Sequence, residues 1–146
     1  MRMENGESEM GRVTSEVLLA NNQDVQLADR GMLGPEAVRK LRVTGIVDSG
    51  ATHMVLPKKI ADQLGLPLRG DVTVRYADDR TARREIAEEL SVEVFGRRST
   101  FRAIVEPDRS TVLIGAIVLE DLDLLVDCSR QALVPRDPER TTAVIE

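Results

Sequence analysis

Val47-Asp48-Ser49-Gly50-Ala51-Thr52 is the stretch around which the remainder of the sequence is arranged. It lies between two apolar runs, Leu41 to Val47 and Met54 to Leu56, whose aliphatic residues predict buried strands. Gly50 permits a tight turn and the close approach of a ligand or a second backbone, because it has no Cβ. The loop therefore directs the Asp48 carboxylate out of a hydrophobic setting, and acids in such settings concentrate at functional sites.

A second apolar element stands nearer the C-terminus. Val112-Leu113-Ile114-Gly115 is followed by a short run of helical composition and then by a further strand pattern. The loop at Asp48, with Leu56-Pro57 after it, and this second element together resemble the retroviral-type (retropepsin-like) aspartic proteases over most of the chain. The small stand-alone bacterial members are the most similar. The resemblance implies that Ile114 and Gly115 pack beneath the active-site loop.

The resemblance also implies an all-β fold, a closed or partly open barrel with one or two short helices and a flap hairpin, acting as a homodimer. Asp48 would then be the catalytic residue. The other positions that the resemblance assigns form two groups. Those that support the active-site loop are Ser49, Gly50, Ala51 and Thr52, and those of the flap, which would close over an extended peptide or protein substrate, are Tyr76, Ala77, Asp78, Asp79 and Arg80. Asp79 stands where the family often carries a glycine.

Aspartic proteolysis requires two carboxylates that share one proton. One accepts a proton from the attacking water while the other donates a proton to the scissile carbonyl. The sequence contains one Asp-Ser/Thr-Gly loop, because Asp29-Arg30-Gly31 lacks the hydroxyl residue. The second carboxylate must come from another copy of the chain, which puts two Asp48 residues on a two-fold axis. We therefore expect a homodimer that hydrolyses peptide bonds without a metal or a cofactor.

The first part of the chain predicts a hairpin, and the middle of the chain predicts a short helix. Val13 to Leu19 and Val25 to Leu27 have the composition of strands, and the polar residues 21–24 between them are typical of a turn. Residues 58–64 have helical composition after Pro57. Gly65 suits the end of that helix, because glycine readily adopts the left-handed conformation found there.

A further hairpin is predicted from residues 71–76 and 81–90, around the polar tip at residues 77–80. Residues 82–90 could form an amphipathic helix on propensity alone. The strand alternation that continues beyond them favours a strand. Short strands separated by turns at fairly regular spacing indicate an all-β barrel or sandwich.

Composition argues against several classes of function. Aromatic residues make up 2% of the 146 residues, which leaves the core to Val, Leu and Ile and argues against stacking platforms for nucleic acid. The formal net charge of -5 disfavours nonspecific attachment to nucleic acid or to anionic membranes. One cysteine and one histidine argue against a zinc site. Cys128 follows an apolar strand pattern, and we expect it to be a buried small side chain.

Three segments are expected along the chain. Residues 1–10 form a flexible N-terminal segment, residues 11–136 form the protease domain, and residues 137–146 form a tail that could reach the dimer interface. The sequence has no apolar stretch long enough for a transmembrane helix, and its charged start lacks the apolar part of a signal peptide. We therefore expect a cytoplasmic protein.

Two alternatives to a protease are consistent with the sequence. A catalytically silent dimer of the same fold could bind or scaffold extended peptides in its groove, because a fold does not imply a function. A monomeric β-barrel that binds an unrelated ligand would sediment with a mass near 16.1 kDa. Asp48 next to Gly50 favours the enzyme over both.

Overall fold

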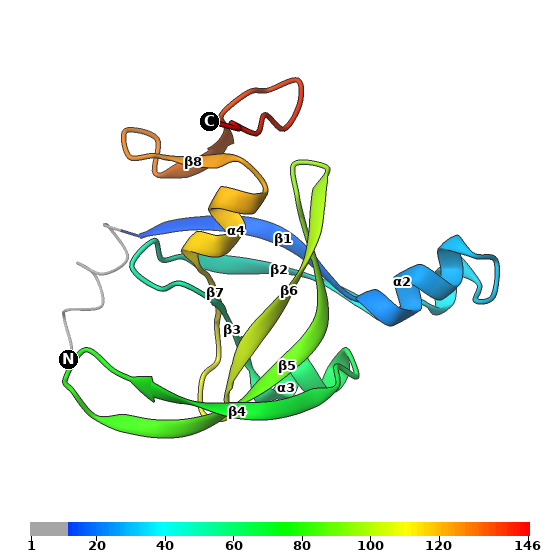
Figure 1. Cartoon of the computed structure of the whole chain (residues 1–146), viewed down its shortest axis with the longest axis horizontal. Coiled ribbons are helices and arrows are strands. Elements are labelled where there is room, and N and C mark those ends of the chain that lie inside the picture. Colours follow the sequence, from blue (N-terminus) through cyan, green and yellow to red (C-terminus); the bar gives the residue numbers. More distant parts are fainter. Residues whose placement is uncertain (1–11) are drawn as a thin grey trace.

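The computed structural model describes residues 12–146, which form a closed six-stranded barrel with an attached hairpin, three short α-helices and a C-terminal two-stranded sheet (Figure 1). The strands are β1 (Val13–Asn21), β2 (Lys40–Val47), β3 (Met54–Pro57), β4 (Leu68–Arg75), β5 (Thr81–Val94), β6 (Arg97–Glu106), β7 (Val112–Ile114), β8 (Leu124–Asp127) and β9 (Ala132–Pro135). The helices are α2 (Asn22–Asp29), α3 (Lys58–Gln63) and α4 (Ala116–Asp121), with a 3-10 turn η1 (Pro35–Ala37). None of the helices in this part of the chain could span a lipid bilayer.

Hydrogen bonds between strands close the barrel. The strands are joined in the order β1-β2-β7-β3-β6-β5, and β1 pairs back onto β5 between Leu18 and Asn21. β4 pairs with β5 alone, so it lies outside the ring and forms the hairpin with β5. The predicted all-β barrel with a flap-like hairpin is therefore confirmed.

Aliphatic side chains fill the barrel. Leu19, Met54, Leu56, Leu90 and Ile114 are all fully buried and come from four different strands, β1, β3, β5 and β7. Burial of such side chains is the main favourable contribution to folding. A core made of aliphatic residues agrees with the small number of aromatic residues in the sequence.

The two elements that carry the sequence resemblance lie side by side. β7 runs parallel to β2 and antiparallel to β3, so it lies between the two strands that flank the Asp48 loop. Val47, the last residue of β2, pairs with Ile114, the last residue of β7. Asp48 and Gly115 therefore leave the barrel at the same end.

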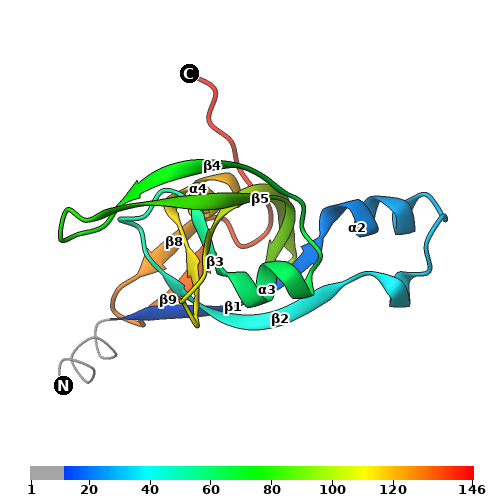
Figure 2. The ribbon, with the colours of Figure 1, turned by 90° about the horizontal axis from the view of Figure 1, so that it is seen from below.

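The hairpin of β4 and β5 extends from the barrel at the opposite end from α2 (Figures 1 and 2). β5 is one continuous strand, as the alternation beyond residue 90 predicts, because it pairs with β4 on one side and with β6 on the other. In the sequence, helix α3 lies between β3 and β4. Gly65 ends the helix in the left-handed conformation, with φ of 65°, as expected.

The predicted hairpin at residues 13–27 is wrong, because the second strand is helix α2. Asn21 belongs to β1 and also caps α2, since its side-chain oxygen accepts a hydrogen bond from the Asp24 N–H at 3.1 Å. Its amide group donates to the Leu64 carbonyl at 2.9 Å, which joins this corner to α3. The polar residues therefore start a helix instead of turning the chain between two strands.

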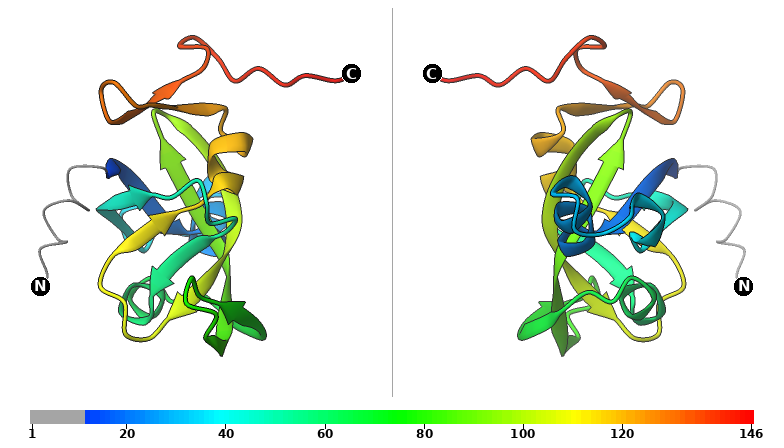
Figure 3. Two further views of the ribbon diagram at one scale, coloured as in Figure 1. Left: turned by 90° about the vertical axis from the view of Figure 1, so that its left-hand side faces the viewer. Right: turned by 90° about the vertical axis from the view of Figure 1, so that its right-hand side faces the viewer.

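The C-terminal residues form a separate layer over α4. β8 and β9 pair with each other, and the tail after β9 continues beyond them (Figure 3). Asp123 holds the tail, because it accepts hydrogen bonds from Arg136 at 2.6 and 3.0 Å and from the Thr142 N–H at 2.9 Å. Cys128 is exposed, and its predicted burial is wrong because β8 ends at Asp127. The flexible segment predicted at residues 1–10 lies outside the described residues.

Candidate active site

Backbone hydrogen bonds shape the loop that carries Asp48. The Asp48 N–H donates to the Ile114 carbonyl at 3.0 Å, which continues the pairing of β2 and β7 by one residue. The Ala51 N–H donates to the Asp48 carbonyl at 3.1 Å, and the Gly50 N–H donates to Asp48 Oδ1 at 3.0 Å. Asp48 is half-buried, whereas Ser49 and Gly50 are exposed. The loop thus holds one carboxylate oxygen by its own backbone and leaves Oδ2 available.

Helix α4 supports the same loop from below. The Ala116 N–H donates to the Ala51 carbonyl at 2.7 Å, and the Ile117 N–H donates to the Thr52 carbonyl at 3.0 Å. Gly115 allows this contact, because a Cβ at that position would overlap the backbone of Thr52 and His53. Ile114 and Gly115 therefore lie beneath the loop, where the sequence resemblance puts them.

The loop and the β4–β5 hairpin line one cleft of about 530 Å³. Asp48, Gly50 and Ala51 line it from the loop, and Tyr76 and Ala77 line it from the hairpin. Ser49 and Thr52 are exposed and do not line the cleft. The structure thus brings part of each predicted group together across a space that could hold a peptide segment.

The remaining flap positions form the exposed tip of the hairpin. The Tyr76 N–H donates to the Arg80 carbonyl at 2.8 Å, and Arg80 pairs with Asp78 at 2.8 Å. The Arg80 guanidinium also lies 5.0 Å from the centre of the Tyr76 ring. Asp79 has φ of 68°, the left-handed conformation that glycine adopts most easily. The backbone at the tip therefore has a conformation that favours glycine, although the residue at this position is Asp79.

Glu106 joins the hairpin to β6 inside the cleft. Tyr76 Oη donates a hydrogen bond to Glu106 Oε2 at 2.6 Å, and Arg84 Nε donates to Glu106 Oε1 at 2.7 Å. The hydrogen bond to the carboxylate raises the pKa of Tyr76 above its ordinary value of 10.0. Glu106 therefore has both oxygens engaged and anchors the base of the hairpin tip.

Arg109, on the loop between β6 and β7, also lines the cleft. Its Nε donates to the Thr111 carbonyl at 2.8 Å, which fixes the head of the side chain. Burial lowers the pKa of the Arg109 guanidinium below its ordinary value of 12.5. The charges of Glu106 and Asp48 oppose this shift, and the charge of Arg12 adds to it. The cleft thus contains a partly desolvated cation close to Asp48.

A family model described as "gag-polyprotein putative aspartyl protease" matches residues 37–121, which is more than half of the chain. The chain belongs to this family. Among solved structures, "EIAV protease complexed with the inhibitor HBY-793" is similar, with a TM-score of 0.52 and 17% sequence identity over 76% of this chain and 88% of that chain. At that identity the likeness shows the fold alone, which is that of retroviral proteases. No curated protein sequence matches the chain.

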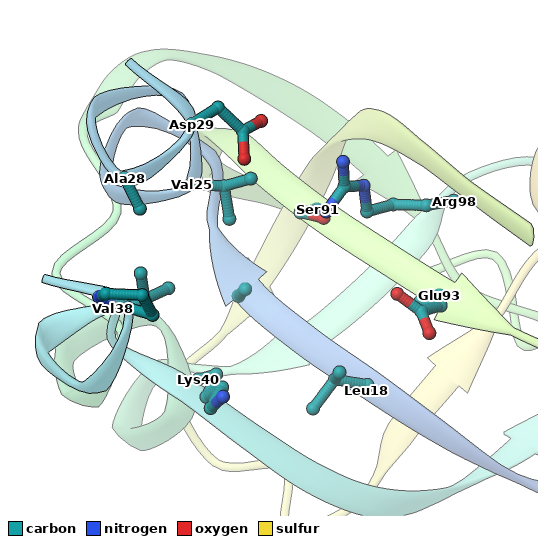
Figure 4. A pocket seen from close by; sticks show the side chains of 11 residues that line it. Leu18, Val25, Ala28, Asp29, Val38, Lys40, Ser91, Glu93 and Arg98 are labelled. Atoms are coloured by element: carbon teal, nitrogen blue, oxygen red, sulfur yellow. The ribbon is translucent and has the colours of Figure 1, made fainter. Parts of the chain in front are cut away.

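A second cavity in this aspartyl protease family member lies away from the Asp48 loop. It has a volume of about 210 Å³ and lies between α2 and strands β1 and β5 (Figure 4). Apolar side chains and four charged ones line it, the charged residues being Asp29, Lys40, Glu93 and Arg98. Because the two signs are equally represented, the lining favours no single class of ligand.

Sequence reasoning did not find Glu106 or Arg109 as cleft residues of this retropepsin-like chain. Both lie in the run Glu106 to Ser110, whose charged residues, proline and serine are typical of a solvated loop. The partners of Glu106 lie 22 and 30 residues away, so no local spacing indicates the contacts. One signal in the sequence could have indicated that this run lies near Asp48. The run directly precedes β7, and β7 pairs with the end of β2, from which the Asp48 loop leaves.

Proposed function

We propose that the chain is an aspartic endopeptidase in which two Asp48 carboxylates, one from each subunit of a homodimer, activate water to hydrolyse peptide bonds. Membership of the aspartyl protease family supports this chemistry. The observation that carries the proposal is that Asp48 lines a cleft whose other wall is the β4–β5 hairpin. A peptide in that cleft would lie against the carboxylate and beneath the hairpin.

The charges in the cleft support the need for a second subunit. Among the described residues that line it, the carboxylates are those of Asp48 and Glu106. Glu106 is engaged by Tyr76 and Arg84, so it is not free to share a proton with Asp48. A catalytic pair then requires a second Asp48, and two-fold symmetry brings identical loops together.

The proposed reaction uses the pair in one protonated and one ionised form. The ionised Asp48 accepts a proton from water as the water attacks the scissile carbonyl carbon, and the protonated Asp48 donates its proton to the carbonyl oxygen. Collapse of the tetrahedral intermediate breaks the C–N bond, and the amine leaves with a proton from the pair. Apolar side chains of Val55, Ile104 and Leu113 line the same cleft and reduce the access of bulk water.

The substrate in this proposal is an extended peptide or protein segment. The exposed backbone of Gly50 can approach the substrate main chain closely. The Ser49 hydroxyl, which is exposed in the single chain, can brace the two loops across the dimer. The hairpin tip of Tyr76 to Arg80 would close over the segment. We propose the cytoplasm as the location of the protein.

A cleavage assay with a diverse peptide library tests the proposal. Wild type and Asp48→Asn are compared at several pH values, at concentrations where sedimentation shows a dimer. We expect wild type to cut a subset of peptides, Asp48→Asn to cut none, and a statine-type transition-state mimic to block the wild type. Cleavage that persists in Asp48→Asn would overturn the assignment of Asp48. A verified dimer that cuts nothing but binds peptides would identify a silent binding module.

A further inference from the structure

The charge of Arg109 has no direct partner in the described part of the chain. Its Nε–H donates a hydrogen bond to the Thr111 carbonyl at 2.8 Å. Within residues 12–146, no carboxylate lies within ion-pair distance of the guanidinium. An arginine carries five N–H donors, so the two terminal nitrogens still present unused donors. Partial burial of such a cation without a paired anion costs free energy.

The other charged residues that line the cleft do not provide a paired anion for Arg109. Glu106 accepts from Tyr76 and Arg84 and is neutralised by the latter. Arg75, the second arginine of the lining, is largely exposed and lies 3.7 Å from Asp79 at the exposed hairpin tip. Asp48 is near enough to influence Arg109 but is the residue that the catalytic pair requires. A ligand that entered here would meet one cation that is both partly desolvated and unpaired.

We propose that Arg109 selects substrates with an aspartate or glutamate side chain close to the scissile bond, an inference that rests on the proposed peptidase function. A planar guanidinium can donate two parallel hydrogen bonds to a carboxylate, and hydrogen bonds between charged groups are about twice as strong as neutral ones. Arg109 shares the cleft with Asp48, so the carboxylate it binds belongs to a residue near the bond that is cut. In a symmetric dimer each side of that bond has its own Arg109.

Pairs of peptides that differ only by Glu or Gln at one position near the cleaved bond test this inference. Gln has nearly the same size as Glu and lacks the charge. We expect wild type to favour the Glu peptide in kcat/KM by roughly ten- to a hundredfold, as a hydrogen-bonded charge pair provides. Arg109→Gln should bring the ratio near one, and Arg109→Glu should make the enzyme favour a Lys peptide. Arg75→Gln, which changes the exposed arginine of the same cleft, should keep the wild-type ratio.

The pH dependence of cleavage separates selection from an effect on Asp48. If Arg109 acted only on the catalytic pair, Arg109→Gln would lower cleavage of the Glu and Gln peptides equally and move the acidic limb of the profile. That result would overturn the inference. A wild-type ratio near one for every tested position would overturn it as well. Thermal unfolding of each variant verifies that the fold is retained.

Binding measurements keep this inference separate from the peptidase proposal. Fluorescence anisotropy of the same labelled peptides is measured with Asp48→Asn and with Asp48→Asn combined with Arg109→Gln. Tighter binding of the Glu peptide that depends on Arg109 would support the selection even if wild type cut nothing, in which case the peptidase proposal alone would fail. Cleavage by wild type without any preference for Glu would sustain the peptidase and overturn the role of Arg109.

Discussion

The absence of one Cβ, at position 115, determines how closely helix α4 can approach the loop that carries Asp48. The carbonyls of Ala51 and Thr52 accept hydrogen bonds from the first turn of α4, at 2.7 and 3.0 Å. The backbone of His53 occupies the space that a side chain at position 115 would need. Main-chain contacts, which cannot move aside as a flexible side chain can, therefore fix the position of the loop that carries Asp48 relative to α4.

Gly115→Ala is expected to destabilise the protein by about 1–3 kcal/mol, since the added methyl group must displace backbone. Gly45→Ala is a matched control, because its Cβ would meet side-chain atoms instead of backbone: Cδ1 and Cγ1 of Ile114 at 2.9 and 3.0 Å and Cγ1 of Val112 at 3.5 Å. We expect a smaller loss of stability for Gly45→Ala. Urea unfolding of the two variants measures the difference, and equal losses would contradict the account of Gly115.

Among single residues, the sequence predicts those whose roles depend on the conformation of the neighbouring backbone. Asp48, Gly50 and Gly115 stand in short runs of strand and turn residues whose order alone indicates a loop and a close contact. Glu106 and Arg109 could not be found in this way, because their roles depend on side chains that meet across the cleft. Cys128 was assigned to the interior because it follows an apolar pattern, whereas β8 ends one residue before it.

Among the elements, the β4–β5 hairpin depends on one side-chain anchor near its tip. Tyr76 Oη donates to Glu106 at 2.6 Å, and Arg84 holds the other oxygen of that carboxylate. This anchor ties the hairpin to β6, the strand that leads into the Arg109 loop. Its loss would free the tip without changing the pairing of the strands.

Tyr76→Phe removes the anchoring hydroxyl and keeps the ring over which Arg80 lies. A hydrogen bond to a charged group contributes roughly 1.5–3 kcal/mol, so the open hairpin should become about ten- to a hundredfold more populated. We expect faster amide exchange at the hairpin tip, where the Tyr76 N–H donates to the Arg80 carbonyl, and a higher KM for peptides. Thr73→Val, at an exposed position of β4, is the control. Amide exchange that is unchanged in Tyr76→Phe would show that Glu106 does not anchor the hairpin.

The segment with α2 depends on an ion pair between the buried carboxylate of Asp24 and the exposed Arg39. Asp24 is 7% exposed and accepts hydrogen bonds from Arg39 through the backbone N–H at 3.0 Å, Nε at 2.8 Å and Nη2 at 3.0 Å. These bonds, chiefly those of the side chain, lower the pKa of Asp24 below its ordinary value of 3.8, and burial opposes the shift. Because the carboxylate has a lower pKa in the folded state than in the unfolded state, the pair stabilises the fold above the ordinary value. That stabilisation is lost as the pH falls through the folded-state pKa.

Asp24→Asn is expected to lower the free energy of unfolding at neutral pH by about 1–3 kcal/mol. The difference from wild type should shrink as the pH falls below the ordinary pKa of 3.8 and through the lower pKa of the folded state, because wild type then loses the same charge. Asp62→Asn, which breaks the exposed pair with Lys58 at 2.7 Å, should change stability by less than about 1 kcal/mol. Chemical unfolding across this pH range measures both, and a difference that stays constant with pH would contradict the assignment.

The element that sequence reasoning missed, α2, illustrates a limit of local patterns. Asn21 to Asp24 has a composition that suits either a turn or a helix start, and Val25 and Leu27 alternate as a strand would. The contacts of Asn21 with α3 and of Asp24 with Arg39 favour the helix, and both lie far along the chain. The β4–β5 hairpin was predictable because its alternation extends over many residues of β5 and β6.

For the whole molecule, the proposed homodimer makes activity depend on two copies of one residue. The barrel itself was predictable from its short strands, but its closure through β1 and β5 joins residues too far apart for any local signal. The homodimer is inferred from the chemistry of the reaction, which needs two carboxylates. In the described part of the chain, Asp48 is the one carboxylate of the cleft that is not engaged by other side chains. This dependence on two subunits can be measured directly.

Mixing wild type with Asp48→Asn subunits should reduce activity more than dilution does. If each site needs two Asp48 residues, random pairing in an equal mixture leaves about one quarter of the sites intact. Independent sites would leave one half. Activity is measured against the fraction of variant at constant total concentration, after exchange of differently tagged subunits verifies that the two kinds pair equally. A linear decrease would contradict a shared site.

The position of β4 outside the closed ring has a consequence for how the protein can change over generations. Movement of the hairpin tip breaks none of the hydrogen bonds that close the six-stranded ring. The rate at which a peptide enters the cleft and the resistance of the fold to heat can therefore vary independently. A laboratory selection for faster turnover would then collect substitutions in β4 and its turn while the melting temperature stays near that of the starting protein.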